Sequence, residues 1–256
     1  MSCCPVTAEP ARGAAPSTGA VKKIGQTTVY VTGPATAKAG IIAYPDIFGL
    51  DSGRSKADAD TLGRLGYSVV LVDLVDGDYL DPDSDWMSTL GDWLKKYTYD
   101  SHYSAHINDA VNYLKSEAQV ERIASYGYCW GSWVGATKTA SADPVMTGHV
   151  SFHPAWNVEN LTKGDGAVDK LAESVQAPQL LLAAGDDPDF VKPQGSVHKI
   201  LAARGGDIAA KSNVIEFPSE NHGWVHRGDL ENPATKKAVM EAWHAAVKFI
   251  QTVNPL

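Results

Sequence analysis

The sequence predicts an α/β fold in which helices cover both faces of a doubly wound, mostly parallel sheet. First, short β-branched and apolar runs alternate along the chain with longer amphipathic stretches. Second, residues 40–44, 55–65 and 68–73 have the spacing of a strand, a helix and a parallel strand joined by a right-handed crossover. Third, residues 123–135 have the pattern of a strand, a very tight turn and a helix.

The other elements follow from the same two patterns. Strands are expected where short apolar runs are bounded by glycine, proline or small polar residues, and helices where apolar residues recur at helical intervals. On this basis further strands are expected at residues 27–32, 148–152, 180–184 and 213–217, and further helices at residues 86–96, 102–115, 130–140, 192–203 and 233–251.

Composition and length favour a single α/β domain preceded by a tail. The chain has 256 residues, of which 44% are hydrophobic and 20% charged, as in ordinary globular proteins. Residues 1–20 are rich in Ala, Pro, Gly, Ser and Thr without periodicity, so we expect a flexible N-terminal tail. Residues 21–256 are expected to form one domain.

Charge and cysteine usage exclude several function classes. A net charge of −8 argues against nucleic-acid partners and anionic membranes, which need clustered Lys and Arg. The sequence has neither an apolar run long enough to span a bilayer nor a secretory signal, so a cytoplasmic location is expected.

Three cysteines cannot form a disulfide framework. Adjacent Cys3 and Cys4 lack zinc-site spacing, and we expect a mobile pair without a role and no metal site.

Residues 127–131 (Gly-Tyr-Cys-Trp-Gly) place one thiol at the tip of the predicted turn. Glycines flank a nucleophile at such a turn because the neighbouring backbone leaves no room for side chains. Cys129 at a helix start feels the positive end of the helix dipole, which favours the thiolate. The backbone N–H of Trp130 would then face a developing oxyanion. The alternative is a small buried cysteine that only packs a strand on a helix.

An acid and a histidine follow downstream, each where a predicted strand ends. Residues 185–189 are rich in aspartate, and His222 follows the strand predicted at residues 213–217. The carboxyl ends of parallel strands meet at one edge of a sheet, so a thiol, an imidazole and a carboxylate would converge there. In this order they suit a triad. The alternatives are a polar turn and a histidine that binds the backbone of its loop.

Four segments of the chain resemble the dienelactone hydrolase family, the cysteine-nucleophile branch of the α/β-hydrolases. They are residues 44–49 (YPDIFG), 127–131 (GYCWG) and 222–227 (HGWVHR), with 91–94 (GDWL) similar to carboxymethylenebutenolidase-like members. The resemblance implies an α/β-hydrolase fold for most of the chain after the tail.

The resemblance also implies a triad of Cys129, an aspartate and His222. Without a gap, the family pattern puts the acid at Asp187; one inserted residue brings Asp189 into the same place. We choose Asp187 and keep Asp189 as the alternative.

Further roles are implied by the same resemblance. The backbone N–H groups of Trp130 and Ile47 would form the oxyanion hole. The acid at Asp46 would contact the resting thiol and help to raise the thiolate, although family members often carry the longer Glu there. The alternative for Asp46 is a cap on the turn that follows it.

The predicted substrate is a small neutral ester or lactone. Residues 75–85 carry several aspartates and no Arg or Lys, so an anionic ligand would be repelled there. Arg227 remains a candidate for binding a carboxylate. Candidate pocket residues are Tyr44, His153, Trp156, Trp224 and Arg227, although aromatic residues near the sheet more often belong to a plain core.

Together these patterns predict a carboxylic ester or lactone hydrolase that acts through a thioester acyl-enzyme. It would need no cofactor, and it would be a monomer or a homodimer. One alternative is a non-catalytic thiol sensor or small-ligand-binding protein on the same scaffold, since fold alone does not fix function. Another is an enzyme that acts on large substrates such as glycans or peptides.

Overall fold

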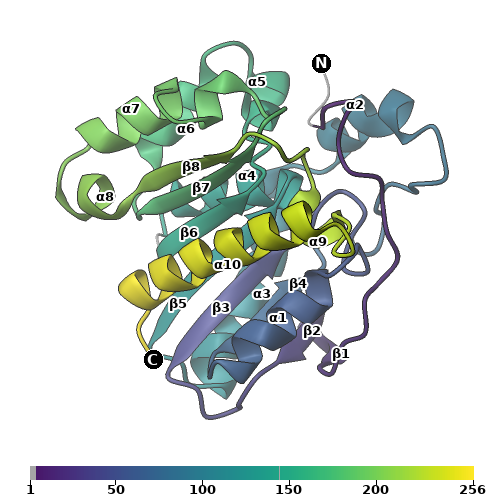
Figure 1. Ribbon diagram of the computed structural model, residues 1–256. Helices are drawn as coiled ribbons and strands as arrows, with labels where there is room; N and C mark the ends of the chain where they lie inside the picture. Colours follow the sequence, from purple (N-terminus) through teal and green to yellow (C-terminus); the bar gives the residue numbers. More distant parts are fainter. Residues whose placement is uncertain (1–3, 144) are drawn as a thin grey trace.

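The computed structural model, which describes residues 4–143 and 145–256, is built on an eight-stranded sheet (Figure 1). The spatial order is β1-β2-β4-β3-β5-β6-β7-β8. β2 runs antiparallel to both β1 and β4, and the other neighbours are parallel. The strands are β1 Ala20–Ile24, β2 Thr27–Thr32, β3 Ala39–Tyr44, β4 Ser68–Val72, β5 Arg122–Tyr128, β6 Met146–Phe152, β7 Gln179–Ala184 and β8 Asn213–Phe217.

Helices cover both faces of this sheet, which confirms the predicted doubly wound architecture. Residues of α1 and α10 belong to the hydrophobic core on one face, and those of α3, α4, α6 and α7 to the core on the other (Figure 1). The α-helices are α1 Ser55–Arg64, α2 Trp86–Lys96, α3 Ser104–Asn112, α4 Trp130–Thr139, α5 Asn157–Lys163, α6 Ala167–Ser174, α7 Ser196–Ala203, α8 Gly206–Lys211, α9 Trp224–Arg227 and α10 Pro233–Val253. Short π-helical or 3-10 segments are η1 Tyr99–Tyr103, η2 Tyr113–Glu117 and η3 Asp189–Val191.

The central strands are apolar on both sides because both sides are covered. All six residues of β3 are buried. Ile41 faces the core beneath α1 and α10, while Ile42 faces the core beneath α3 and α4. A short, continuously apolar run is what a parallel strand between two helical layers requires.

Some elements differ from the sequence-based expectation. β1 was not predicted, because its residues Ala-Val-Lys-Lys-Ile are mostly exposed and lack a clear apolar face. The helix expected from residue 192 begins only at Ser196. Pro193 explains the delay, since the residue before a proline is disfavoured in the α region. Helices α5, α6, α8 and α9 were also not predicted.

Residues 4–19, which belong to the predicted tail, contain no helix or strand but lie against the rest of the chain (Figure 1). The N–H of Glu9 donates to the carbonyl of His222 at 2.7 Å. Two further backbone hydrogen bonds, each of 2.8 Å, join this segment to Gly53. The N–H of Gly53 donates to the carbonyl of Arg12, and the N–H of Ala15 donates to the carbonyl of Gly53. The segment therefore follows the edge of the sheet where the parallel strands end. Cys3 lies outside the described residues.

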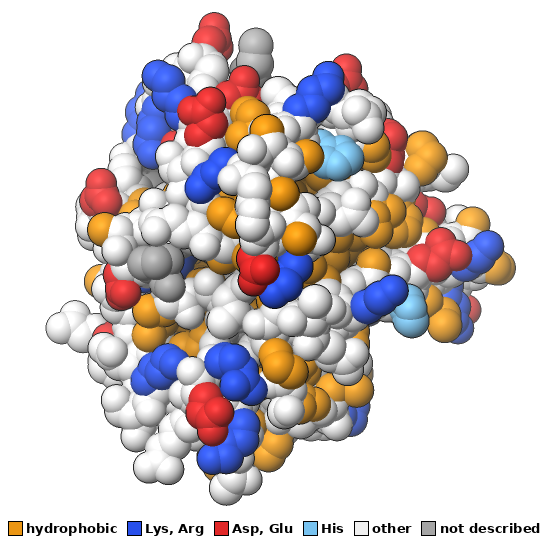
Figure 2. Space-filling model, turned by 90° about the vertical axis from the view of Figure 1, so that its left-hand side faces the viewer, with side chains coloured by type: hydrophobic (Ala, Val, Ile, Leu, Met, Phe, Trp, Pro, Cys, Tyr) orange, Lys and Arg blue, Asp and Glu red, His pale blue; other side chains and the backbone are white. Residues whose placement is uncertain are grey.

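The face shown in Figure 2 carries charges of both signs. On the face shown in Figure 2, Lys and Arg side chains lie among Asp and Glu side chains. Among the helices of residues 4–143 and 145–256, none combines the length and the apolar character needed to cross a membrane.

Close packing that a sequence change can test occurs at Gly131. A Cβ there would lie 2.2 Å from the carbonyl oxygen of Pro45. We expect Gly131→Ala to lower the free energy of unfolding by about 1–3 kcal/mol, because the backbone of the loop after β3 must move away. Gly91, exposed on α2 with no atom near its would-be Cβ, is the matched control. Gly91→Ala should raise stability by up to about 1 kcal/mol. Urea unfolding followed by tryptophan fluorescence measures both, and equal effects would contradict this packing argument.

Candidate active site

Cys129 occupies the tight turn between β5 and α4. Its backbone has φ 52° and ψ −120°, a conformation that is costly for a residue with a side chain. Close packing holds the turn in place: a Cβ on Gly127 would lie 2.4 Å from the carbonyl oxygen of Gly131. The Cys129 thiol is thereby presented at the N-terminal end of a ten-residue helix, where the helix dipole favours a negative charge.

Asp187 and His222 form a buried pair at the same edge of the sheet. Asp187 Oδ1 lies 2.6 Å from His222 Nδ1, and neither side chain is exposed. The other oxygen of Asp187 accepts the N–H of Ala184, the last residue of β7, at 2.7 Å. Burial alone would lower the pKa of His222, but the Asp187 carboxylate outweighs it and raises the pKa to about 10.

The alternative acid, Asp189, lies elsewhere. Its side chain is exposed in η3, and its charged partner is Lys192 at 3.8 Å. Of the two aspartates that the sequence left open, the structure therefore brings Asp187 next to His222.

The imidazole and two thiols converge. A ring nitrogen of His222, the sulfur of Cys129 and the sulfur of Cys4 all lie within 4.8 Å of one another. Because Asp187 occupies Nδ1, Nε2 is the nitrogen left for the sulfurs. The two sulfurs are 3.2 Å apart. The sequence predicted that Cys4 belongs to a mobile pair without a role. In the structure Cys4 is buried, with 2% of its surface exposed, so its position was not expected.

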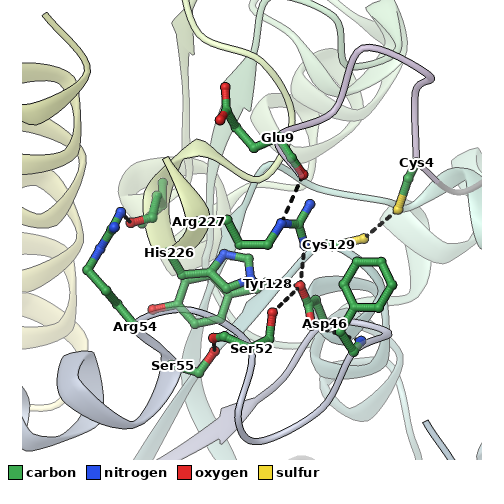
Figure 3. Close-up of polar contacts among 12 residues, drawn as sticks. Cys4, Glu9, Asp46, Ser52, Arg54, Ser55, Tyr128, Cys129, His226 and Arg227 are labelled. Atoms are coloured by element: carbon green, nitrogen blue, oxygen red, sulfur yellow. Dashed lines mark hydrogen bonds and ion pairs between the residues drawn. The ribbon is translucent and has the colours of Figure 1, made fainter. Parts of the chain in front are cut away.

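Asp46 is the centre of a buried polar cluster beside the sulfurs (Figure 3). Its carboxylate accepts from Ser52 Oγ at 2.9 Å, from His226 Nε2 at 2.8 Å and from Arg227. The backbone N–H of Phe48 donates to it at 3.0 Å. Burial alone would raise the pKa of Asp46, but His226 and Arg227 lower it to about 2. Asp46 is therefore a permanent anion inside the protein.

Arg227 links this anion to the thiols. Burial opposes its charge, but the neighbouring acidic groups Asp46, Cys4 and Cys129 raise the pKa of Arg227 above its ordinary value. Its Nε also donates to the carbonyl of Glu9 at 3.1 Å (Figure 3). A fixed cation at this place favours thiolate over thiol.

The two residues expected to form an oxyanion hole are brought near each other. Trp130 is the first residue of α4, and Ile47 is a buried residue of the loop after β3. The close approach of Gly131 to Pro45 holds this loop against the start of α4. Both backbones therefore belong to the immediate surroundings of Cys129.

The aromatic candidates fall into two groups. His153 lies beside the imidazole of His222, with ring centroids 4.8 Å apart, and Trp224 lies beside His153, with ring centroids 5.6 Å apart. Trp156 is buried, and its Nε1 donates to Ser151 Oγ at 3.2 Å. Tyr44 is a core residue at the end of β3, next to the ring of His149.

Two clefts open beside the thiols, separated by Cys4, Pro5 and Val6, which line both. One of about 220 Å³ also includes Phe48 and Arg227. The other, about 490 Å³, includes Asp186. A larger cleft of about 620 Å³ lies among α2, α4 and α6, but Cys4 does not line it, so the two clefts beside Cys4 are the relevant spaces.

Sequence reasoning missed several groups of this site. His226 carried a visible signal, because it follows His222 by four residues and lies in a segment already matched to the family. Ser52 and Cys4 carried none, since a serine in a loop and a cysteine in an aperiodic segment are both uninformative. Asp186, whose Oδ1 accepts the N–H of His222 at 2.6 Å, was seen only as part of an acidic turn.

The buried Asp46 cluster predicts a specific acid sensitivity. A carboxyl whose folded pKa is lowered stabilises the fold above its unfolded pKa, near 4, and the benefit disappears as the pH falls toward 2. When the pH falls from 5 to 3, the loss of the Asp46 contribution should lower the free energy of unfolding by about 1 kcal/mol. Urea titrations of wild type and Asp46→Asn at both pH values test this. If the variant loses as much stability as wild type over this range, Asp46 is not the titrating group.

The chain is similar to a known family and to several known proteins. The dienelactone hydrolase family model matches residues 27–254. An uncharacterized AIM2 family protein of Schizosaccharomyces pombe is 30% identical, covering 98% of this chain and 99% of that protein. The mouse carboxymethylenebutenolidase homolog is 26% identical, covering 86% of this chain and 85% of that protein.

Solved structures show the same fold. A structure titled m3DLH has a TM-score of 0.65 at 18% identity, covering 93% of this chain and 98% of that one. The esterase Est2 of Thermogutta terrifontis has a TM-score of 0.59 at 15% identity, covering 93% of each chain. The predicted α/β-hydrolase fold is thus confirmed, and the chain belongs to the dienelactone hydrolase family of hydrolases.

Proposed function

We propose that this protein hydrolyses small neutral esters or lactones, with Cys129 as nucleophile and a thioester acyl-enzyme as intermediate. The observation that carries the proposal is the buried Asp187–His222 pair beside the Cys129 sulfur at a strained turn. Membership of a hydrolase family favours turnover over a purely sensing or binding role.

Each residue would have a distinct part in the reaction. The Cys129 thiolate attacks the carbonyl carbon, and the N–H groups of Trp130 and Ile47 stabilise the tetrahedral oxyanion. His222, oriented by Asp187, protonates the leaving alkoxide and then removes a proton from the water that cleaves the thioester. For a lactone, the leaving alkoxide stays attached to the acyl group.

Arg227 supports the choice of a neutral substrate. It was a candidate for binding a substrate carboxylate, but its guanidinium already pairs with Asp46 and bonds to the Glu9 carbonyl. The loop between β4 and α2 adds acidic side chains, among them exposed Asp81 and Asp83. An anionic substrate would be repelled by these side chains, and Arg227 is already engaged by Asp46.

Access to the thiol would require the N-terminal segment to move. Cys129 is fully buried and Cys4 lies on it. We propose that residues 1–20 act as a flexible tail that leaves the site when substrate enters, while residues 21–256 remain one domain. We further propose a monomer or homodimer, with no nucleic-acid partner. The proposed location is the cytoplasm, a compartment that keeps thiols reduced.

The nucleophile can be tested with a chromogenic short-chain acyl ester and a small lactone. We expect wild type to show a burst of product and an acyl adduct on Cys129 in the intact mass of quenched samples. Cys129→Ala, with an unchanged circular dichroism spectrum, should show neither. Full turnover by the folded variant would rule out the thioester route.

The triad acid can be tested by two matched substitutions. Asp187→Asn should lower kcat by about 10³–10⁴-fold, because His222 would lose the carboxylate that fixes its tautomer and supports its charge. Asp189→Asn, the control on the same turn, should stay near wild type because Asp189 is exposed and remote from His222. The opposite ranking in steady-state assays would assign the role to Asp189.

A further inference from the structure

The sulfur of Cys4 lies next to the sulfur of Cys129, a contact that hydrolysis does not require. The two sulfurs lie 3.2 Å apart, and both side chains are buried (Figure 3). A disulfide needs a separation of about 2.05 Å, so an approach of about 1 Å would join them. Cys4 belongs to a segment without helix or strand, which can supply that movement more readily than the packed turn at Cys129.

The N-terminal segment is held so that Cys4 remains at this place. Thr7 Oγ1 donates to Asp186 at 2.5 Å, and the Glu9 backbone bonds to His222 and to Arg227. These contacts come from the loops that carry the predicted catalytic imidazole and its neighbouring cation. The position of Cys4 is therefore tied to the site itself.

The charges around both sulfurs favour the reactive form of each. The Arg227 cation interacts with both Cys4 and Cys129, and the side chain of Cys4 also interacts with His222. Thiolates are the species that attack peroxides and disulfides. Cys4 lines both of the clefts that open to solvent, so a small oxidant meets it first.

From these observations we propose that Cys4 and Cys129 form a reversible disulfide that fastens the N-terminal segment over the site and stops turnover. The oxidant is hydrogen peroxide. The existence of the bond is independent of the proposed function, whereas its effect on turnover rests on it.

The oxidation proceeds in two balanced steps. The Cys4 thiolate attacks one peroxide oxygen, the O–O bond breaks, and a hydroxide leaves a sulfenic acid on Cys4. The Cys129 thiolate then attacks the Cys4 sulfur; the S–S bond forms, the S–O bond breaks and a second hydroxide leaves. The two thiols lose two electrons in total, and the peroxide is reduced to two molecules of water after protonation. A dithiol or phosphine reductant reverses the bond.

The test compares wild type, Cys3→Ser and Cys4→Ser before and after treatment with hydrogen peroxide. EDTA is present throughout, because two thiols and an imidazole are also a donor set for zinc. Intact mass, tryptic mapping without reductant and ester turnover are measured on the same samples. Cys3→Ser is the matched control, since it removes the adjacent cysteine and leaves Cys4 as the sole thiol of tryptic peptide 1–12.

The expected result in wild type and Cys3→Ser is a loss of about 2 Da and a cross-link between tryptic peptides 1–12 and 123–138. Turnover should fall in proportion to the cross-linked fraction and return with tris(2-carboxyethyl)phosphine. Cys4→Ser should form no cross-link, and any turnover that it loses should accompany a mass gain from oxidation of Cys129 and not a loss of about 2 Da.

Other outcomes would overturn the proposal. A cross-link that disappears in Cys3→Ser but persists in Cys4→Ser would assign the bond to Cys3. Oxidation of Cys129 without a cross-link would show that the disulfide does not form. Full turnover by the cross-linked protein would show that the disulfide does not regulate the enzyme. A reduced wild type without turnover would instead refute the proposed hydrolysis, and the mass and peptide readouts would still decide whether the bond forms.

Discussion

The buried carboxylate of Asp46 connects parts of the chain that are far apart in sequence. It binds Ser52 in its own loop and both His226 and Arg227 on α9. Arg227 in turn binds the backbone of Glu9 in the N-terminal segment. Removing one member of a buried ion pair leaves an uncompensated charge, which costs about 3–5 kcal/mol. The loop after β3, helix α9 and the N-terminal segment therefore hold their positions through one shared anion.

The same anion sets the electrostatics of the thiols. Asp46 keeps Arg227 charged inside the protein, and Arg227 acts on both sulfurs. His222 supplies a second positive group because Asp187 stabilises its protonated form. Two buried carboxylates thus keep two cations beside the sulfurs. Both cations favour the thiolate form of the cysteines, whereas burial alone would favour the neutral thiol.

Patterns of neighbouring residues in the sequence predicted most of the fold. The features that these patterns did not predict depend on contacts between residues far apart in the sequence. β3 and the turn at Cys129 were visible because a buried apolar run and flanking glycines are properties of neighbouring residues. The choice between Asp187 and Asp189 stayed open, since it depends on how the turn after β7 folds back onto Ala184. Cys4 could not be foreseen, because its partner lies 125 residues away and its own segment has no periodicity.

The N-terminal segment also has a consequence for the order of folding. Glu9 binds Arg227, 218 residues later in the chain, and Thr7 binds Asp186, 179 residues later. Contacts between such distant residues carry a large loop-closure entropy and form efficiently only after the intervening chain has collapsed. During synthesis this segment leaves the ribosome before its partners do. The covering of Cys129 by this segment therefore follows the folding of the residues that separate the segment from its partners.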